Sequence, residues 1–443
     1  MRRHTTMDTP TLLAHLETDC APLTLPRGGT LCWDDADLHR AAHAADPEGY
    51  ALLGLAPGVR PWQRARVLLQ VLAASQAGLD DQARATLARV SRALSLALPP
   101  AHVVTVLLGL RRLRANHKHT TRAVLRFVLE HPDADALIAA RRPVLVDCFE
   151  HALGKATARG CARRIAEGDT GSDYLQRRLL RFLTAPERAP ARVAALYAPA
   201  HPGAEPPHEP ALHLDDASEH TPTVTATNRG EIAATLVHLY RGGPAEELYT
   251  ALGRYLSTAV AGYPPFPGTV ALVLDASASM RGYGDREWAV LSQAAALRMV
   301  LSEVCRRLEV VEVGGQERIP RGATDLALGV LDALGTAPDL VAVVSDGYEN
   351  LFPGDLARVV ATLPRTGVTT PVVFCHPMFT AGDDLTLRRP APALPQRGFW
   401  HQDDFAELLT WMFGHCAAGE PWLRAALHRR LDALDREIGR LRA

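Results

Sequence analysis

The feature that most constrains the fold is a change of hydrophobic pattern near Gly268. Between about Pro61 and Tyr197, apolar residues recur at three- and four-residue spacing, which is typical of successive amphipathic helices. After Gly268, short apolar runs without a polar face alternate with helical segments, which is typical of a parallel sheet covered by helices on both faces. We therefore expect a multidomain chain, with an N-terminal all-α, helical-repeat-like module followed by a doubly wound, Rossmann-like α/β domain.

Breaks in these patterns divide the chain into segments. Residues 1–197 are expected to form the helical module, in which short joints between helices resemble stacked HEAT-type pairs, although no fixed period marks a repeat. Residues 198–229 are rich in Pro, Ala and acidic residues and are expected to form a linker or long loop. Helices at 230–262 are assigned to the helical module. The α/β domain follows at 263–418, and an amphipathic helix at 419–443 ends the chain.

The pattern also predicts individual elements. In the helical part, helices are expected at 65–77, 80–97, 103–113, 120–131, 143–153, 158–167, 173–183, 231–240 and 245–260. In the α/β domain, strands are expected at 269–274, 308–313, 340–344 and 370–374, and helices at 286–306, 325–334, 354–363 and 404–413.

Three predicted loops of the α/β domain carry oxygen ligands. Asp275, Ser277 and Ser279 directly follow the first strand, at the edge where doubly wound sheets bind ligands. Thr324 immediately precedes a helix, and Asp346 follows the strand at 340–344. A few carboxylates with hydroxyls are hard ligands that suit Mg²⁺. The competing interpretation is that the Ser-rich loop only caps the next helix, a position that Ser and Asp favour.

In this order along the chain, the five residues resemble the metal ion-dependent adhesion site of the von Willebrand factor A family, over about residues 268–415. The resemblance implies that Ser277, Ser279 and Thr324 reach a metal directly or through water, and that Asp275 and Asp346 act directly or by supporting these ligands. It implies Mg²⁺, Mn²⁺ or Ca²⁺ as cofactor. It also implies that an acidic group of a partner protein completes the coordination.

A narrower resemblance concerns the junction of the two parts. The helix at 248–260, the break at 264–268 and the strand with its Asp275 motif resemble the passage from helical module to A-type domain in the TROVE family (telomerase, Ro and vault proteins). Glu349 and Asn350, after Asp346, fit the same relatives. This resemblance implies a ring of HEAT-like helices that binds structured small RNA or RNA ends. The helical part is shorter here, and its linker is rich in proline.

Local charge gives a candidate RNA surface. The whole chain has a formal net charge of -1, but basic residues outnumber acidic ones between residues 101 and 200. Lys118, Arg122 and Arg126 follow one another at four-residue spacing and form a basic stripe on a predicted helix. The candidate nucleic-acid-binding residues are Arg111, Arg112, Arg114, His117, Lys118, His119, Arg122 and Arg126. The alternative is that they lie on solvated outer faces, in a chain whose many arginines reflect the composition of a GC-rich bacterial genome.

Several functions lack the sequence features that they require. The chain contains no phosphate-binding P-loop, zinc-protease or serine-hydrolase motif, so no enzymatic activity is expected. The 7 cysteines are odd in number and contain no C-x-x-C pair, which favours a reducing compartment. No signal peptide or membrane span is recognisable, so we expect a cytoplasmic protein without a membrane partner.

The sequence thus predicts a metal-dependent binding or scaffold protein. Its A-type domain would use a Mg²⁺-type site to grip an acidic ligand, and its basic helical module would bind structured small RNA, as in Ro-like proteins. The alternative is a protein-interaction adaptor that works with a MoxR-like AAA+ ATPase and binds no RNA.

Overall fold

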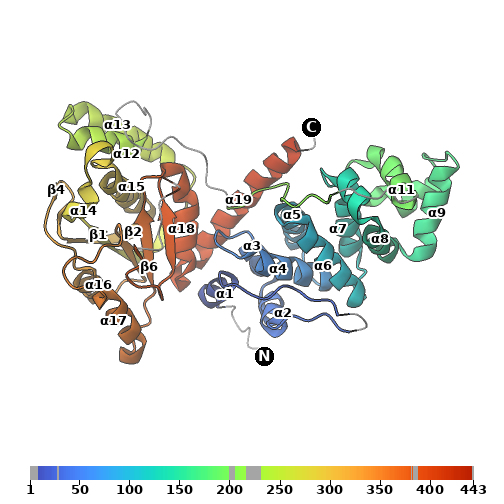
Figure 1. The fold of residues 1–443 in the computed structure, drawn as a ribbon, viewed down its shortest axis with the longest axis horizontal. Helices are drawn as coiled ribbons and strands as arrows, with labels where there is room; N and C mark the ends of the chain where they lie inside the picture. Colours follow the sequence, from blue (N-terminus) through green and yellow to red (C-terminus); the bar gives the residue numbers. More distant parts are fainter. Residues whose placement is uncertain are drawn as a thin grey trace. The chain divides into compact units, whose positions relative to one another are not determined.

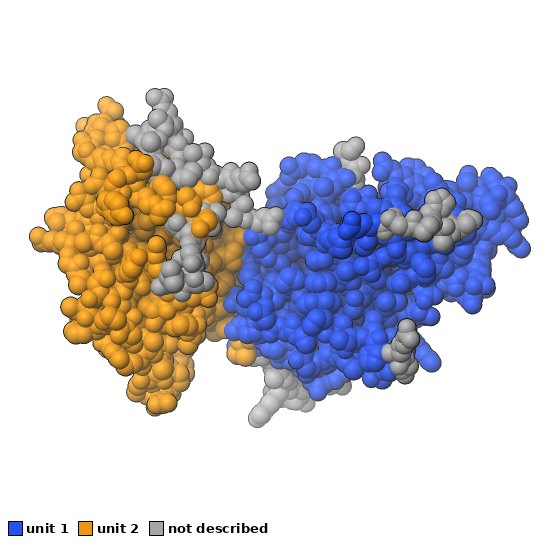
Figure 2. Space-filling view, viewed as in Figure 1, with its two compact units in different colours: residues 1–8, 12–215, 427–443 blue, residues 9–11, 216–426 orange. Residues whose placement is uncertain are grey.

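The computed structural model describes residues 8–26, 29–198, 205–215, 231–380, 382 and 388–441. The chain divides into two compact units (Figure 2). We call residues 1–8, 12–215 and 427–443 the helical unit, and residues 9–11 and 216–426 the sheet unit.

The expected N-terminal helical region is present. Its α-helices are α1 (Thr9–Leu16), α2 (Ala36–Ala45), α3 (Pro47–Leu53), α4 (Pro61–Ala73), α5 (Asp81–Ala97), α6 (Pro100–Arg112), α7 (Lys118–Glu130), α8 (Ala134–Leu153), α9 (Lys155–Ala166), α10 (Asp173–Arg178) and α11 (Ala189–Tyr197) (Figure 1). Two 3-10 turns, η1 (Leu180–Phe182) and η2 (Pro186–Arg188), lie between the last two helices. The final helix, α19 (Glu420–Arg440), enters the helical unit at residue 427.

Helix α5 shows how the sequence builds this unit. The carboxylate of Asp80 accepts a hydrogen bond from Ala83 N (2.7 Å) and so caps the helix. Leu87, Val90 and Leu94 follow at three- and four-residue spacing, and all three are fully buried. The polar N-cap therefore defines where the helix begins, and the apolar face defines the side that packs.

Two expectations for the helical part need correction. Helix α8 begins at Ala134 rather than at Pro143, and Pro143 lies inside it after a kink at Arg141 (φ -129°, ψ 24°). A proline fits this position because the helix is already interrupted there. The segment expected as one helix at 173–183 is the short α10 followed by η1.

Part of the expected linker is packed on the helical unit. Leu212 is fully buried, and its N–H donates to Leu96 O (3.0 Å). Asp215 forms an ion pair with the buried Arg64 at 2.5 Å. Residues 205–215 are thus a fixed part of this unit, whereas 199–204 and 216–230 lie outside the described residues.

The sheet unit contains the expected parallel sheet. Its five strands are β1 (Phe266–Asp275), β2 (Cys305–Val313), β5 (Leu340–Val344), β6 (Val372–Pro377) and β7 (Gln396–Phe399), in the order β2-β1-β5-β6-β7. Every neighbouring pair is parallel. A short antiparallel pair, β3 (Gly315–Gln316) and β4 (Ile319–Pro320), follows β2.

Helices cover both faces of this sheet, as expected. They are α12 (Ile232–Tyr240), α13 (Ala245–Ala259), α14 (Ala278–Arg281), α15 (Ala289–Val304), α16 (Leu326–Gly335), α17 (Asp355–Thr362) and α18 (Phe405–Gly414), with 3-10 turns η3 (Gly284–Arg286), η4 (Leu363–Thr366), η6 (Gln402–Asp404) and η7 (Ala417–Gly419). Leu272 and Leu274 of β1 face a core shared with α12, α13, α15 and α18, and Ala271 and Val273 face α16 and α17. Alternate residues of one strand therefore serve two cores.

The compact units differ from the segments expected from the sequence. Helices α12 and α13 were assigned to the helical module, but Ile232, Leu236 and Leu252 belong to the same core as β1 and α15. These helices are therefore part of the sheet unit.

The strand order reverses beside β1. The chain passes from β1 to β2 on one side and later returns to β5 on the other side. The carboxyl ends of β1 and β5, at Asp275 and Val344, therefore border the crevice in which such sheets bind ligands.

All seven cysteines have free thiols. Within the described residues, none of the helices combines the length and the apolar character needed to cross a membrane.

The side chain of Asp35 connects three helices of the helical unit. Its Oδ2 lies 2.8 Å from His15 Nε2 on α1, 3.1 Å from Gln63 Nε2 and 2.5 Å from Arg66 Nη1 on α4. His39 Nε2 on α2 is 3.4 Å away. Burial alone would raise the pKa of Asp35, but hydrogen bonds from His39, His15 and Gln63 hold that pKa well below its usual range.

We predict that Asp35→Asn destabilises the helical unit by roughly 3 kcal/mol, because Arg66 then loses its buried partner. A carboxylate with a lowered folded-state pKa contributes stability above its unfolded pKa, near 3.9, and loses it as pH falls further. The wild-type melting temperature should therefore fall more steeply below about pH 4 than that of Asp35→Asn. Circular dichroism melts at several pH values measure both the destabilisation and the acid dependence of the melting temperature. Asp37→Asn, at an exposed position of α2, is the control, and equal acid slopes for wild type and Asp35→Asn would contradict the prediction.

Candidate metal centre

Asp275 ends β1 and is fully buried. Its Oδ2 accepts a hydrogen bond from Ser345 Oγ (2.6 Å), and its Oδ1 accepts one from Ser277 N (2.9 Å). Burial raises the pKa of Asp275 to about 6, and nearby Asp346 adds to the rise, although the bonds from Ser345 and Ser277 oppose it. The protein therefore holds a carboxylate where its negative charge is poorly solvated.

Ser277 and Ser279 follow on the same loop. Their Oγ atoms lie 3.0 Å apart, with Ser277 fully buried and Ser279 half-buried. Gly314, with φ at +76°, lies against Ser277, and a Cβ on it would be 2.8 Å from Ser277 Cβ. The absence of that side chain lets the loop after β2 approach the serine closely.

The helix-capping interpretation fits this loop poorly. Ser277 occupies the N-cap position of α14, but its side chain makes no capping hydrogen bond. The hydroxyl faces Ser279 instead. Helix capping therefore does not occupy the Ser277 hydroxyl, which lies beside the Ser279 hydroxyl on the same loop.

Thr324 precedes α16 and is fully buried. Capping of α16 is done by its neighbour Asp325, whose Oδ1 accepts a hydrogen bond from Leu328 N (3.0 Å). Among the described residues, Thr324 Oγ1 has no hydrogen-bond partner. A buried polar atom without a partner costs about 1–3 kcal/mol. The hydroxyl is therefore placed for a group that the described residues do not supply.

Asp346 follows β5 and is 7% exposed. Its Oδ1 accepts a hydrogen bond from Tyr348 N (3.1 Å). Burial raises its pKa, against the hydrogen bonds from Tyr348 and Ser279 and the charge of Arg388. The bond from Ser279 connects this loop to the loop after β1.

The loop after β5 also meets the loop that carries Thr324. Leu351 N donates to Thr324 O (3.3 Å). All five residues expected at a metal site therefore lie on loops that contact one another at one edge of the sheet. Carboxylates and hydroxyls are the hard oxygen ligands that suit Mg²⁺, Mn²⁺ or Ca²⁺, and the residues present fit such a cation.

The comparisons with known proteins add nothing to this geometry. No protein-family model matches the chain, and no curated protein matches its sequence. The case for the site rests on the fold, the orphaned Thr324 hydroxyl and the two buried carboxylates.

Sequence reasoning did not include Ser345 among the site residues. Its Oγ donates to Asp275 and accepts a hydrogen bond from Gly347 N (3.0 Å), so it fixes the carboxylate. Its position directly after β5, beside Asp346, was the available signal.

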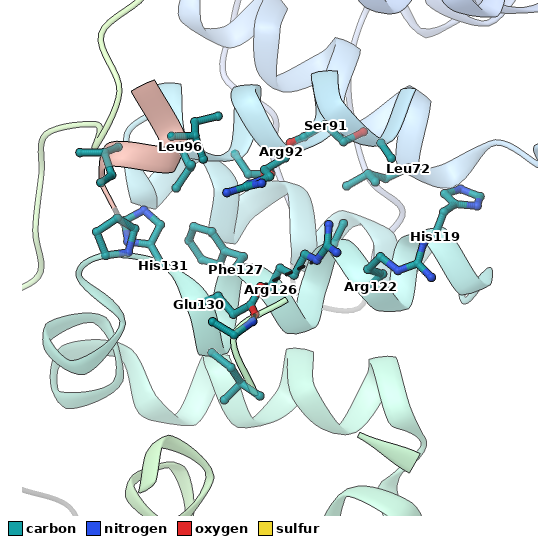
Figure 3. A pocket seen from close by; sticks show the side chains of 18 of the residues that line it. Leu72, Ser91, Arg92, Leu96, His119, Arg122, Arg126, Phe127, Glu130 and His131 are labelled. Atoms are coloured by element: carbon teal, nitrogen blue, oxygen red, sulfur yellow. Dashed lines mark hydrogen bonds and ion pairs between the residues drawn. The ribbon is translucent and has the colours of Figure 1, made fainter. Parts of the chain in front are cut away.

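The candidate nucleic-acid residues fall into two groups. Arg111, Arg112, Arg114, His117 and Lys118 are exposed around the end of α6 and the start of α7, and Arg111 pairs with Asp147 (2.7 Å). His119, Arg122 and Arg126 instead line a pocket inside the helical unit (Figure 3). The expected stripe on α7 is therefore shared between the surface and this pocket.

His15, Asp35 and His39 form another compact cluster, with one ligand atom from each lying within 4.8 Å of the others. The guanidinium of Arg66 already contacts the Asp35 carboxylate. A metal cation beside it would be repelled, so we interpret this cluster as structural.

We predict that Thr324→Val leaves the melting temperature of the metal-free protein unchanged or raises it, because the variant removes an unsatisfied buried hydroxyl. The same variant should lose most of the stabilisation that wild type gains from Mg²⁺. Thermal unfolding in EDTA and across a Mg²⁺ titration measures both effects.

Thr336→Val is the matched control, because the Thr336 hydroxyl donates to Ala333 O at the far end of α16. It should respond to Mg²⁺ as wild type does. A Thr324→Val protein that is destabilised without metal, yet keeps the full Mg²⁺ response, would contradict a ligand role for this hydroxyl.

Proposed function

We propose that this chain is a metal-dependent binding protein of the von Willebrand factor A type, not an enzyme. Its sheet unit would hold Mg²⁺, with Mn²⁺ or Ca²⁺ as substitutes, and use it to grip an acidic group of a partner protein. The observation that carries the proposal is the buried Thr324 hydroxyl, which has no partner in the described chain and lies on a loop that contacts the Asp346 loop.

The five residues would contribute different ligands to the metal. Ser277, Ser279 and Thr324 offer neutral hydroxyl oxygens, and Asp275 and Asp346 offer the charge that balances a divalent ion. When bound, the ion supplies the positive charge that attracts a carboxylate of the partner. Ser345 orients Asp275 through its 2.6 Å hydrogen bond.

Exposed apolar side chains near the site favour a protein partner. Tyr283 is 89% exposed after α14, and Tyr348, Leu351 and Phe352 are about half exposed after Asp346. Exposed aromatic and apolar groups around a polar centre are typical of protein interfaces. They would bury against the residues that flank the partner's acidic group.

The identity of the partner separates two versions of this proposal. In one, the helical unit adds binding of structured small RNA. In the other, the chain is an adaptor that works with a MoxR-like AAA+ ATPase and binds no RNA. Both use the same acidic-group capture by the sheet unit.

Selection from a displayed random peptide library in Mg²⁺ tests the acidic-group capture. We expect the recovered peptides to contain Asp or Glu, to be released by EDTA and to bind Thr324→Val at least about tenfold more weakly, a loss of about 1.4 kcal/mol. The change removes one coordinating hydroxyl while keeping the side-chain volume.

Asp332→Asn is the control, because it removes an exposed acid from α16, the helix that follows Thr324. This variant should bind the peptides as wild type does. Peptides that bind equally in EDTA, or that carry no carboxylate, would contradict the proposed grip.

The exposed basic residues favour RNA as a second ligand. A fluorescent RNA hairpin at low salt should bind wild type, and Lys118→Gln combined with Arg112→Gln should weaken binding and reduce the salt slope by about one per lost phosphate contact. Arg163→Gln combined with Arg177→Gln, at other exposed positions of this unit, is the control. If wild type binds no hairpin at low salt, the RNA version is rejected.

A further inference from the structure

The helical unit contains a pocket that neither the metal site nor the exposed basic residues explain. It lies between α5 and α7, and residues near the start of α11 and the end of α19 close it. The cavity has a volume of about 130 Å³. Figure 3 shows Arg92, Phe127 and Arg126 gathered in its middle, with His131 and His119 at opposite ends.

Positive charge dominates the lining. The charged lining residues are Arg92, Arg122, Arg126, Arg188, Arg192, Glu130 and Glu187. Of the two acids, Glu130 is already used, because its Oε1 accepts hydrogen bonds from Thr184 N and Ala185 N. The pocket therefore carries more positive charge than its own acids balance.

Two of these arginines are available to a ligand. Arg192 is occupied by Asp135 and by Leu129 O. Arg122 and Arg188 are exposed, and neither has an acidic partner within 4.0 Å in the described part of the chain. Exposed guanidinium groups that line one pocket are suited to bind a phosphate group.

His131 supplies an independent sign of a ligand. It is 1% exposed, and its Nδ1 accepts a hydrogen bond from Asp133 N (3.1 Å), so the proton of the neutral ring lies on Nε2. Burial lowers its pKa to about 4, which keeps the ring neutral near pH 7. Within the described residues, Nε2 has no hydrogen-bond partner. His131 lines the pocket and carries a buried N–H donor that the described residues leave unpaired.

The rest of the lining is apolar. Phe127 and Leu129 of α7, Leu96 of α5 and Ile438 of α19 are buried pocket residues. A cavity of about 150 Å³ lined by apolar groups accommodates benzene. The pocket thus fits a compact ring or short apolar body rather than a folded macromolecule.

We propose that this pocket binds a small phosphate monoester with a compact aromatic or apolar body. The phosphate contacts Arg122 and Arg188 at the mouth. The body packs beside Phe127, where His131 Nε2–H donates a hydrogen bond to a polar atom of the ligand. A phosphate monoester carries about −1.5 to −2 charges near pH 7, which suits this excess of arginine better than a single carboxylate does.

Phenyl phosphate is the probe, titrated calorimetrically into the full chain. We expect binding that weakens with salt and is at least about tenfold weaker in Arg122→Gln combined with Arg188→Gln. Arg163→Gln combined with Arg177→Gln is the control and should bind as wild type does. Absence of phenyl phosphate binding to wild type, or equal binding by the two double variants, overturns the proposal.

A second variant separates ligand binding from folding. His131→Phe keeps a ring beside Phe127 but removes both the unused Nε2–H donor and the Nδ1 acceptor of Asp133 N. It should stay folded, with only the small loss of melting temperature expected from one hydrogen bond, and should bind phenyl phosphate more weakly. His43→Phe is the matched control, because His43 Nε2 is also buried without a partner in the described chain but lies outside the pocket. Unchanged phenyl phosphate binding by His131→Phe overturns the assigned role of His131.

Competition experiments with two oligonucleotides identify the source of the phosphate. Competition by a 5′-phosphorylated oligonucleotide, but not by its 5′-hydroxyl form, would place a nucleic-acid end in the pocket, whereas competition by neither supports a free small molecule. The binding should persist in EDTA. Loss of the metal-dependent peptide capture and loss of phenyl phosphate binding are therefore distinguishable.

Discussion

The buried carboxylate of Asp275 is the constraint on which the sheet edge depends. It lies at the end of β1, where the strand order reverses, and two hydrogen bonds only partly offset its desolvation. The negative charge of a second buried acid, Asp346, further disfavours the ionised form of Asp275. Glycine at position 314 lets a third segment of chain approach the same point. The two buried carboxylates oppose stability when unbalanced, and the proposed cation would make their charge favourable.

Much of this edge could be predicted because its physical causes are local. The strand at 340–344 was predicted with its observed limits, since a fully buried parallel strand needs an uninterrupted apolar run. Strand β7, Gln396–Phe399, was missed because it lies at the sheet edge and includes the polar pair Gln396 and Arg397. The start of β2 at Cys305 was not predicted, because α15 ends at the residue before it and no breaker separates the two elements. The position of Ser345 after β5 was a local signal, but its hydrogen bond to Asp275 spans 70 residues and became visible only in the fold.

The helical unit was predicted less completely. Periodicity identified most helices, but it does not say which helices meet. The pocket combines residues from Leu72 to Leu441, and the assignment of α12 to the sheet unit depends on tertiary packing of Ile232 and Leu236. The basic stripe on α7 was recognised, but the burial that separates Arg126 from Lys118 became visible only in the fold.

Each of the two candidate sites contains a buried polar atom without a partner among the described residues, but the charged groups around the two atoms have opposite signs. The two atoms are Thr324 Oγ1 and His131 Nε2. Thr324 lies on a loop that contacts the loop of the buried Asp346, so a cation is the expected partner of the Thr324 hydroxyl. His131 lines a pocket rich in arginine, so the missing partner is expected to belong to an anion. Because these charge environments exclude each other's ligand, occupation of either site can be measured without filling the other.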